Sequence, residues 1–134
     1  MVVVGRSFLV GKPTALALLN QDATVTIAHS RTPNLPELTR SADILIVATG
    51  NPHFIQRDHV QAGQVIIDVG ITAVSGEKLS EEVGERTIAG DVHFEAVEGL
   101  VSAISPVPGG VGPMTVASLF ENLVLAYERS QKGR

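Results

Sequence analysis

Four short aliphatic runs recur along the chain at nearly equal intervals, and they constrain its fold more than any other feature. The runs start at Val2, Thr24, Ile44 and Val65, so successive starts lie 20 to 22 residues apart. This interval is typical of βα units, in which a helix follows each strand and returns the chain to the same end of the sheet. Each run is continuously apolar, as expected for parallel strands that helices cover on both faces. The pattern predicts an α/β domain with a doubly wound parallel sheet.

The segments between and after these runs supply the remaining predicted elements. Three helices are predicted, over Pro13–Asn20, Pro36–Ser41 and, as a short turn, Asp58–Gln61. The first two begin with a proline, whose missing N–H costs nothing in the first helical turn. A further strand is predicted at Ser102–Ser105, a loop or hairpin at Thr72–Glu85, a last helix from Pro113 to about Arg129, and a frayed tail over Ser130–Arg134.

The last predicted helix carries one apolar stripe. Its apolar residues recur at three- and four-residue steps: Val116, Leu119, Phe120, Leu123, Val124 and Tyr127. Such a stripe normally packs on another surface. We therefore expect a packing partner for this helix.

Composition narrows the classes of function. The length of 134 residues fits one domain, and the net charge of −4 disfavours a basic groove for nucleic acid. With no cysteine, the chain has no disulfide, no thiolate metal site and no cysteine nucleophile. No apolar run approaches the roughly 20 residues of a membrane span, and no signal peptide is visible, so the cytoplasm is expected. The first strand, normally central in such a sheet, starts at Val2, which suggests a truncated chain.

The turn after the first predicted strand is the first candidate ligand site. Gly5, Arg6 and Ser7 open this turn and Gly11 closes it, just before the first predicted helix. A helix N-terminus offers free N–H groups and a positive dipole, so a phosphate is the natural ligand there. The glycines are spaced more widely than in the usual dinucleotide fingerprint. A tight strand-to-helix turn without a ligand is the alternative.

The end of the second predicted strand indicates which dinucleotide would bind. Domains specific for NAD place an acidic residue here, whereas this chain has Ser30 and Arg31. Together with Arg6, these residues would favour a 2′-phosphate through charge-assisted hydrogen bonds, and hence NADP. Taken singly, Arg31 is equally compatible with a solvated loop arginine.

A proline- and glycine-rich loop is the most unusual stretch of the chain. It reads PVPGGVGPMT over residues 106–115, and it is either a rigid strand-to-helix connector or a loop that shapes a cleft near a cofactor's reactive ring. The S-x-x-K match at residues 75–78 is interpreted as chance. The four histidines have no metal-ligand spacing, and Asp68 and Asp91 are predicted to have structural roles.

Six motifs together give the chain a recognisable pattern: GRSFLVGKP, TVTIAHSRT, ADILIVATGNP, VIIDVGI, GDVHF and PVPGGVGPMT. In this order, from Val2 to about Tyr127, the chain resembles the C-terminal, NADP-binding half of bifunctional methylenetetrahydrofolate dehydrogenase/methenyltetrahydrofolate cyclohydrolase, a Rossmann-like domain. The loop PVPGGVGPMT is highly specific to that family. The resemblance implies that residues 1–134 form one NADP-binding domain.

The resemblance also implies a reaction and site residues. The family oxidises 5,10-methylenetetrahydrofolate by hydride transfer to NADP and hydrolyses the methenyl product to 10-formyltetrahydrofolate, in one-carbon metabolism and purine biosynthesis. By motif position, Gly5, Arg6 and Ser7 would line the NADP phosphates, Ser30 the 2′-phosphate and Ile71 the nicotinamide end. Six loop residues would border the folate cleft: Pro108, Gly109, Gly110, Val111, Gly112 and Pro113. Arg31 is added from charge and position alone.

The family's catalytic residues have no counterpart here. Its Tyr and Lys, spaced as Y-x-x-x-K, belong to an N-terminal folate-binding domain, and Tyr127 is the only tyrosine of this chain. The chain is therefore expected to be inactive alone, with tetrahydrofolate derivatives, the folate-binding domain and a second copy in a homodimer as partners. A stand-alone NADP-binding or assembly module is the alternative. An unrelated NADP reductase sharing only the cofactor half is disfavoured by PVPGGVGPMT.

Overall fold

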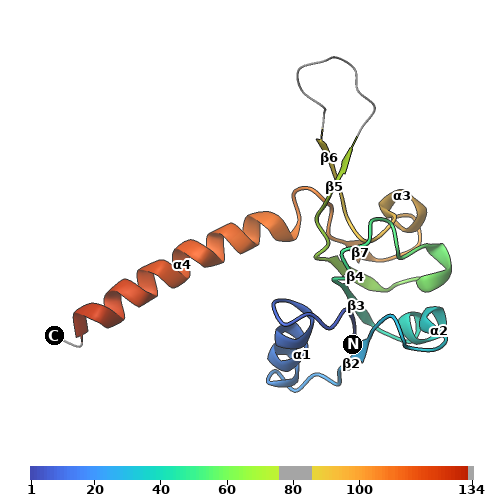
Figure 1. Cartoon of the computed structure of the whole chain (residues 1–134). Helices are drawn as coiled ribbons and strands as arrows, with labels where there is room; N and C mark the ends of the chain where they lie inside the picture. Colours follow the sequence, from blue (N-terminus) through green and yellow to red (C-terminus); the bar gives the residue numbers. More distant parts are fainter. Residues whose placement is uncertain (76–85, 133–134) are drawn as a thin grey trace, which may run out of the picture.

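A five-stranded parallel sheet forms the centre of the molecule (Figure 1). We describe it from a computed structural model, which covers residues 1–75 and 86–132. The strands lie in the order β2 (Thr26–Ala28), β1 (Val2–Val4), β3 (Ile44–Val47), β4 (Val65–Asp68) and β7 (Ala103–Ile104). All four neighbouring pairs are parallel. The prediction of a parallel α/β sheet is confirmed, and the four aliphatic runs and the Ser102–Ser105 segment each supply one strand.

Apolar side chains alternate between the two faces of the sheet, and each face has its own core. On one face Val4, Leu45 and Ile66 belong to a buried cluster onto which Leu38 of α2 (Leu35–Arg40) packs, with Val97 of α3 (Phe94–Val97) also buried in it. On the other face Val3 and Ile46 form a smaller cluster with Ala15 of α1 (Gly11–Leu19). Because helices cover both faces, the sheet is doubly wound.

The predicted connections are confirmed in outline and corrected in detail. A 3₁₀ turn, η1 (Arg57–His59), replaces the short helix predicted at Asp58–Gln61. The segment predicted as a loop or hairpin contributes β5 (Thr72–Ser75), which pairs antiparallel with β6 (Arg86–Ala89). The remainder of that segment, including most of the S-x-x-K match, lies outside the described residues. The four-residue α3 was not predicted.

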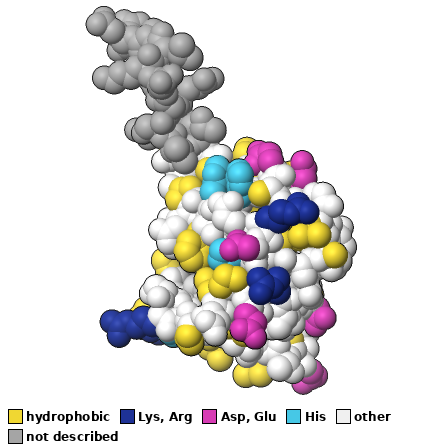
Figure 2. All heavy atoms as spheres, turned by 90° about the vertical axis from the view of Figure 1, so that its right-hand side faces the viewer, with side chains coloured by type: hydrophobic (Ala, Val, Ile, Leu, Met, Phe, Trp, Pro, Cys, Tyr) yellow, Lys and Arg dark blue, Asp and Glu magenta, His cyan; other side chains and the backbone are white. Residues whose placement is uncertain are grey.

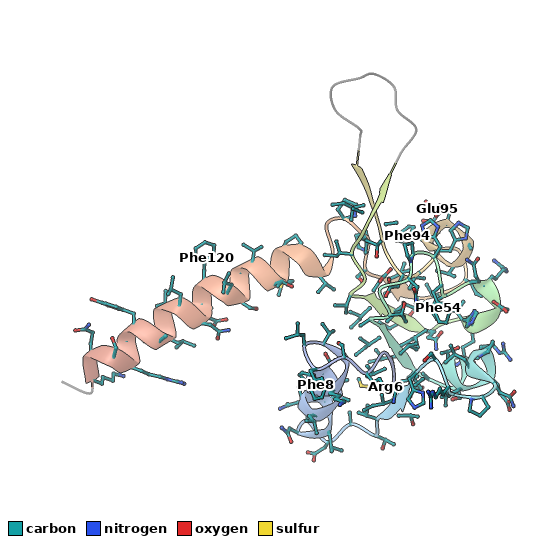
Figure 3. The ribbon with its side chains drawn as sticks, in the orientation of Figure 1. Arg6, Phe8, Phe54, Phe94, Glu95 and Phe120 are labelled. Atoms are coloured by element: carbon teal, nitrogen blue, oxygen red, sulfur yellow. The ribbon has the colours of Figure 1, made fainter. Side chains whose placement is uncertain are left out.

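The last helix, α4 (Val111–Lys132), extends away from the sheet domain (Figure 1). It begins two residues before Pro113, and it continues through Lys132, so the predicted frayed tail is wrong for residues 130–132. The large apolar side chains from Met114 to Tyr127 are 41–68% exposed. Figure 3 shows Phe120 projecting from the helix with no neighbouring element beside it. The predicted apolar stripe is therefore present, and within the described residues it packs on nothing.

Removing residues 114–134 is expected to leave the sheet domain folded. No described side chain of α4 is buried, so its removal takes away no core contact. We expect the melting temperature to change by less than about 5 °C, the shift that corresponds to about 1 kcal/mol in a domain of this size. Thermal unfolding followed by circular dichroism tests this. Loss of cooperative unfolding in the shortened chain would show that α4 stabilises the sheet domain.

Candidate functional site

The candidate site residues gather at one edge of the sheet. In parallel strands the carboxyl ends meet at the same edge, and ligands of such sheets bind in the crevices just beyond it. Two cavities lie along this edge, the first beyond β1, β2 and β3, and the second beyond β4 and β7. The site residues predicted from the sequence divide between these two cavities, except Arg31.

The first cavity has a volume of about 450 Å³ and contains four of the predicted cofactor residues. Figure 3 labels Arg6, on the turn after β1, and Phe54, on the loop after β3, which both line this cavity. The complete lining is Val4, Gly5, Arg6, Ser7, His29, Ser30, Leu35, Ala48, Thr49, Asn51 and Phe54. Sequence reasoning missed Leu35 and Phe54, because both reach the cavity from segments whose path the sequence pattern does not reveal.

Gly5 occupies a position that only glycine fits. Its φ of +135° is a conformation that residues with a side chain rarely adopt, and a Cβ there would collide with the carbonyl oxygen of Ala48. Its N–H donates to the carbonyl oxygen of Ala28 on β2, at 2.9 Å. A Cβ on Gly11 would in turn collide with the backbone of Gly5. The two glycines therefore allow β1, α1 and β3 to approach closely at the floor of the first cavity.

Ser7 organises the turn as well as lining the cavity. Its Oγ accepts the N–H groups of Val10 and Gly11, at 3.1 and 3.2 Å, just where α1 begins. With both acceptor sites of the hydroxyl engaged, the O–H proton is available to donate to a ligand. An anion in the cavity would meet this donor and the Arg6 guanidinium. The first N–H groups of α1 are not free for a ligand as predicted, because Ser7 Oγ accepts that of Gly11 and the carbonyl oxygen of Ser7 accepts that of Lys12 at 3.0 Å.

The turn after β2 is held by its own side chains. Thr32 Oγ1 accepts the N–H of His29 at 2.9 Å, and His29 Nδ1 accepts the N–H of Arg31 at 3.2 Å. These bonds leave Ser30 lining the first cavity. Arg31 is exposed and lines neither cavity, so its proposed contact with a 2′-phosphate stays a prediction.

The second cavity has a volume of about 280 Å³ and is lined mainly by apolar atoms. The loop predicted to shape a cleft does line it, over all six residues from Pro108 to Pro113. Ile71, predicted at the nicotinamide end, lies on the same wall and is 62% exposed. Asp68, at the end of β4, also lines it. The structure thus separates the predicted cofactor-phosphate residues from the predicted cleft residues.

Two buried carboxylates, Asp68 and Asp91, hold the loops at this edge. Asp68 Oδ1 accepts the N–H groups of Gly70 and Asp91, at 2.9 and 3.1 Å, and its Oδ2 accepts that of Val92 at 2.9 Å. The structural roles predicted for both aspartates are confirmed. Burial raises the pKa of Asp68, with the nearby charge of Asp91 acting in the same direction, although the three N–H donors oppose the shift.

The raised pKa of Asp68 predicts a pH dependence of stability. Because the folded protein binds this proton more tightly than the unfolded chain, Asp68 contributes fully to stability below its ordinary pKa of 3.8. The contribution is lost as the pH rises from there through the raised pKa of the folded state. We therefore expect the free energy of unfolding, relative to that of Asp68→Asn, to fall as the pH rises. Urea unfolding of both proteins across this range checks the sign, and a relative stability that rises with pH would contradict it.

One face of the sheet domain carries side chains of several types. Figure 2 shows acidic, basic and histidine side chains interspersed with small apolar patches on one face of the sheet domain. Within residues 1–75 and 86–132, no group of three or more histidine or acidic side chains is placed to hold a metal ion. Nor does any helix in the described part of the chain combine the length and apolarity that crossing a membrane requires.

Several relatives are similar to this chain in sequence, and those of known structure share its fold. The bifunctional protein FolD of Rhizobium johnstonii is 54% identical over 129 residues, which make up 96% of this chain and 42% of that protein. The bifunctional 5,10-methylenetetrahydrofolate dehydrogenase/cyclohydrolase of Thermoplasma acidophilum superposes with a TM-score of 0.86 at 41% identity, over 98% of this chain and 44% of that one. The Trypanosoma brucei dehydrogenase-cyclohydrolase, solved with NADP cofactor and inhibitor, gives a TM-score of 0.86 at 40% identity, over 96% and 43%.

The matches cover nearly all of this chain but only part of each relative. It spans less than half the length of the relatives it matches. A family model described as tetrahydrofolate dehydrogenase/cyclohydrolase, NAD(P)-binding domain, matches residues 1–131. The chain therefore belongs to the NAD(P)-binding domain family of tetrahydrofolate dehydrogenase/cyclohydrolase.

Proposed function

We propose that residues 1–134 form the NADP-binding domain of an enzyme that oxidises 5,10-methylenetetrahydrofolate and hydrolyses 5,10-methenyltetrahydrofolate to 10-formyltetrahydrofolate. The observation that carries this proposal is the pair of cavities along one sheet edge, with the predicted phosphate residues in one and the predicted cleft residues in the other. The Trypanosoma brucei relative, similar over 96% of this chain, was solved with NADP.

The first cavity suits the phosphate-bearing part of NADP. Arg6 would supply a positive charge to the phosphates and Ser7 a free hydroxyl proton. Ser30 would donate to the 2′-phosphate that distinguishes NADP from NAD. No acidic side chain lines this cavity in the described part of the chain, so the 2′-phosphate would meet no repelling carboxylate there.

The second cavity suits the nicotinamide ring and the folate. Ile71 and the loop of residues 108–113 present apolar surface that would hold the ring and exclude water around it. When bound, NADP supplies the hydride acceptor. This chain's part is to orient the acceptor, because the Tyr and Lys expected for catalysis belong to the folate-binding domain. We assign no catalytic residue to residues 1–134.

The exposed stripe of α4 is the proposed contact with the folate-binding domain. Helices in proteins gain most of their stability from packing an amphipathic face, and the face of α4 lacks such packing within the described residues. The folate-binding domain would lie in the additional length of the relatives, which this chain does not cover. We also propose a homodimer and a role in one-carbon metabolism and purine biosynthesis; a cytoplasmic location stays a prediction.

Calorimetric titration of the 134-residue chain with NADP and with NAD tests the proposed function. We expect NADP to bind at least about tenfold more tightly than NAD, the effect of about one net charge-assisted hydrogen bond to the 2′-phosphate. Absence of NADP binding would contradict the proposal. A companion absorbance assay with methylenetetrahydrofolate and NADP should show no turnover by the chain alone, and turnover would favour a catalytic role that we do not assign.

A further inference from the structure

Asp91 makes an unusually concentrated set of long-range hydrogen bonds at the wall of the first cavity. It is fully buried, and its Oδ2 accepts the N–H and the Oγ1–H of Thr49, at 2.5 and 3.0 Å, and the N–H of Gly50, at 2.9 Å. Thr49 lines the first cavity. The sheet ladder ends one residue earlier, where the N–H of Ala48 donates to Val4. Asp91 therefore accepts the backbone N–H groups of Thr49 and Gly50, which directly follow the last residue bonded in the sheet.

The segment that carries Asp91 is itself fixed on both sides. The carbonyl oxygens of Gly90 and Asp91 accept the N–H groups of His53 and Ile55, at 3.0 and 2.9 Å. Asp68 also fixes the segment, because its Oδ1 accepts the N–H of Asp91 at 3.1 Å. The same Asp68 oxygen accepts the N–H of Gly70, which immediately precedes Ile71 of the second cavity. The two carboxylates thus connect a turn of the first cavity with a turn of the second.

We propose that Asp91 is a positioning residue for the dinucleotide: it holds the Thr49–Gly50 turn in the shape that the first cavity needs and, through Asp68, sets this turn relative to the Gly70–Ile71 turn. The proposal rests on the proposed function and assigns Asp91 no contact with the cofactor. A buried carboxylate suits this role because hydrogen bonds to an ionised acceptor are stronger than those between neutral groups.

The hydrogen bonds that Asp91 accepts from Thr49 and Gly50 fall on one carboxylate oxygen, which suggests variants that remove or keep this acceptor. All three fall on Oδ2, whereas Oδ1 is buried without a hydrogen-bond partner among the described residues. Asp91→Asn can place its carbonyl oxygen at the Oδ2 position and keep the acceptor. Asp91→Leu keeps a similar shape without any acceptor. Thr49→Val removes the bond that Thr49 Oγ1 donates to Asp91, together with the bond that Oγ1 accepts from the N–H of Asn51 at 3.1 Å, and it leaves Asp91 intact.

The matched control is Gln64→Met. Gln64 is as buried as Asp91, and its Nε2 donates to the carbonyl oxygens of Thr39 and Ala42, both at 2.7 Å. It lies just before β4, at the amino edge of the sheet, opposite the two cavities. Its substitution should lower the melting temperature through lost buried hydrogen bonds without altering the Thr49–Gly50 turn.

Amide hydrogen exchange and calorimetry with NADP together test the proposal. In the ligand-free protein, Asp91→Leu should accelerate exchange of the Thr49 and Gly50 amides at least about tenfold, and Thr49→Val should accelerate that of Gly50 by about threefold. Affinity for NADP should fall by about tenfold in Asp91→Leu, stay within about threefold in Asp91→Asn, and stay unchanged in Gln64→Met.

Three outcomes would overturn it. Unchanged exchange at Thr49 and Gly50 in a folded Asp91→Leu protein would show that Asp91 does not hold the turn. If Asp91→Leu does not fold, unchanged exchange at Gly50 in Thr49→Val would show the same. If Gln64→Met loses as much NADP affinity as Asp91→Leu, the loss in Asp91→Leu would be explained by lower overall stability and not by the Thr49–Gly50 turn. Failure of the unchanged chain to bind NADP would instead contradict the proposed function, and the exchange data would still decide whether Asp91 positions the turn.

Discussion

Replacing Gly5 with alanine is expected to weaken NADP binding strongly and to destabilise the fold. The new Cβ would require the unfavourable φ of +135° and would push against the carbonyl oxygen of Ala48. Backbone strain and overpacking each cost about 1–3 kcal/mol, so we expect the free energy of unfolding to fall by about 2–6 kcal/mol. Because relief of the collision must separate β1 from β3 at the cavity floor, NADP affinity should fall by about 100-fold. Urea unfolding and calorimetry measure the two effects.

Gly63→Ala is the control for this variant. Gly63 also has a positive φ, of +80°, but a Cβ there meets nothing within 4 Å, and the residue lies in neither cavity. It should therefore lose about 1 kcal/mol of stability and keep its NADP affinity. Normal NADP binding by Gly5→Ala would show that the close approach of β1 and β3 does not shape the cofactor site.

Ser30→Asp is expected to reverse the preference between the two dinucleotides. Ser30 lines the first cavity at the end of β2, where an acidic residue in NAD-specific domains accepts hydrogen bonds from the ribose hydroxyls. A carboxylate there would repel the 2′-phosphate of NADP, and we expect NADP affinity to fall by about 100-fold. Affinity for NAD should stay within about threefold of its original value or improve. Parallel calorimetric titrations with both cofactors measure the change in preference.

Ser130→Asp separates this local effect from that of net charge. Ser130 lies on the exposed α4, away from both cavities, and its replacement adds the same charge. It should leave both affinities unchanged. An equal loss of NADP and NAD affinity in Ser30→Asp would contradict our placement of the 2′-phosphate beside Ser30.

The strands were predictable because burial on both faces of a parallel sheet demands continuous aliphatic runs. Helix starts were less exact. Pro13 and Pro113 each occupy the third residue of their helices, α1 and α4, because none of the first four N–H groups of a helix has an intrahelical partner. A proline therefore marks the first turn without fixing its first residue. The four-residue α3 is too short to produce a periodic signal.

The parts of the candidate site that lie within one short sequence motif were predictable. Gly5 and Ser7 act within one strand-to-helix turn, and the loop of residues 108–113 is recognisable by composition. The bonds from Thr49 to Asp91 join residues 42 positions apart, so only the folded chain reveals them. The same holds for Phe54, which reaches the first cavity from a loop.

The most direct test of the central claim is an amide NMR titration of the chain with NADP. If the carboxyl edge of the sheet is the cofactor site, saturating NADP should shift the amide resonances of Gly5, Arg6, Ser7 and Ser30, with a second set of shifts at Ile71. Shifts confined to the apolar groove between α1 and β2, which Leu16 and Leu19 line, would contradict the claim, as would unshifted resonances at the carboxyl edge.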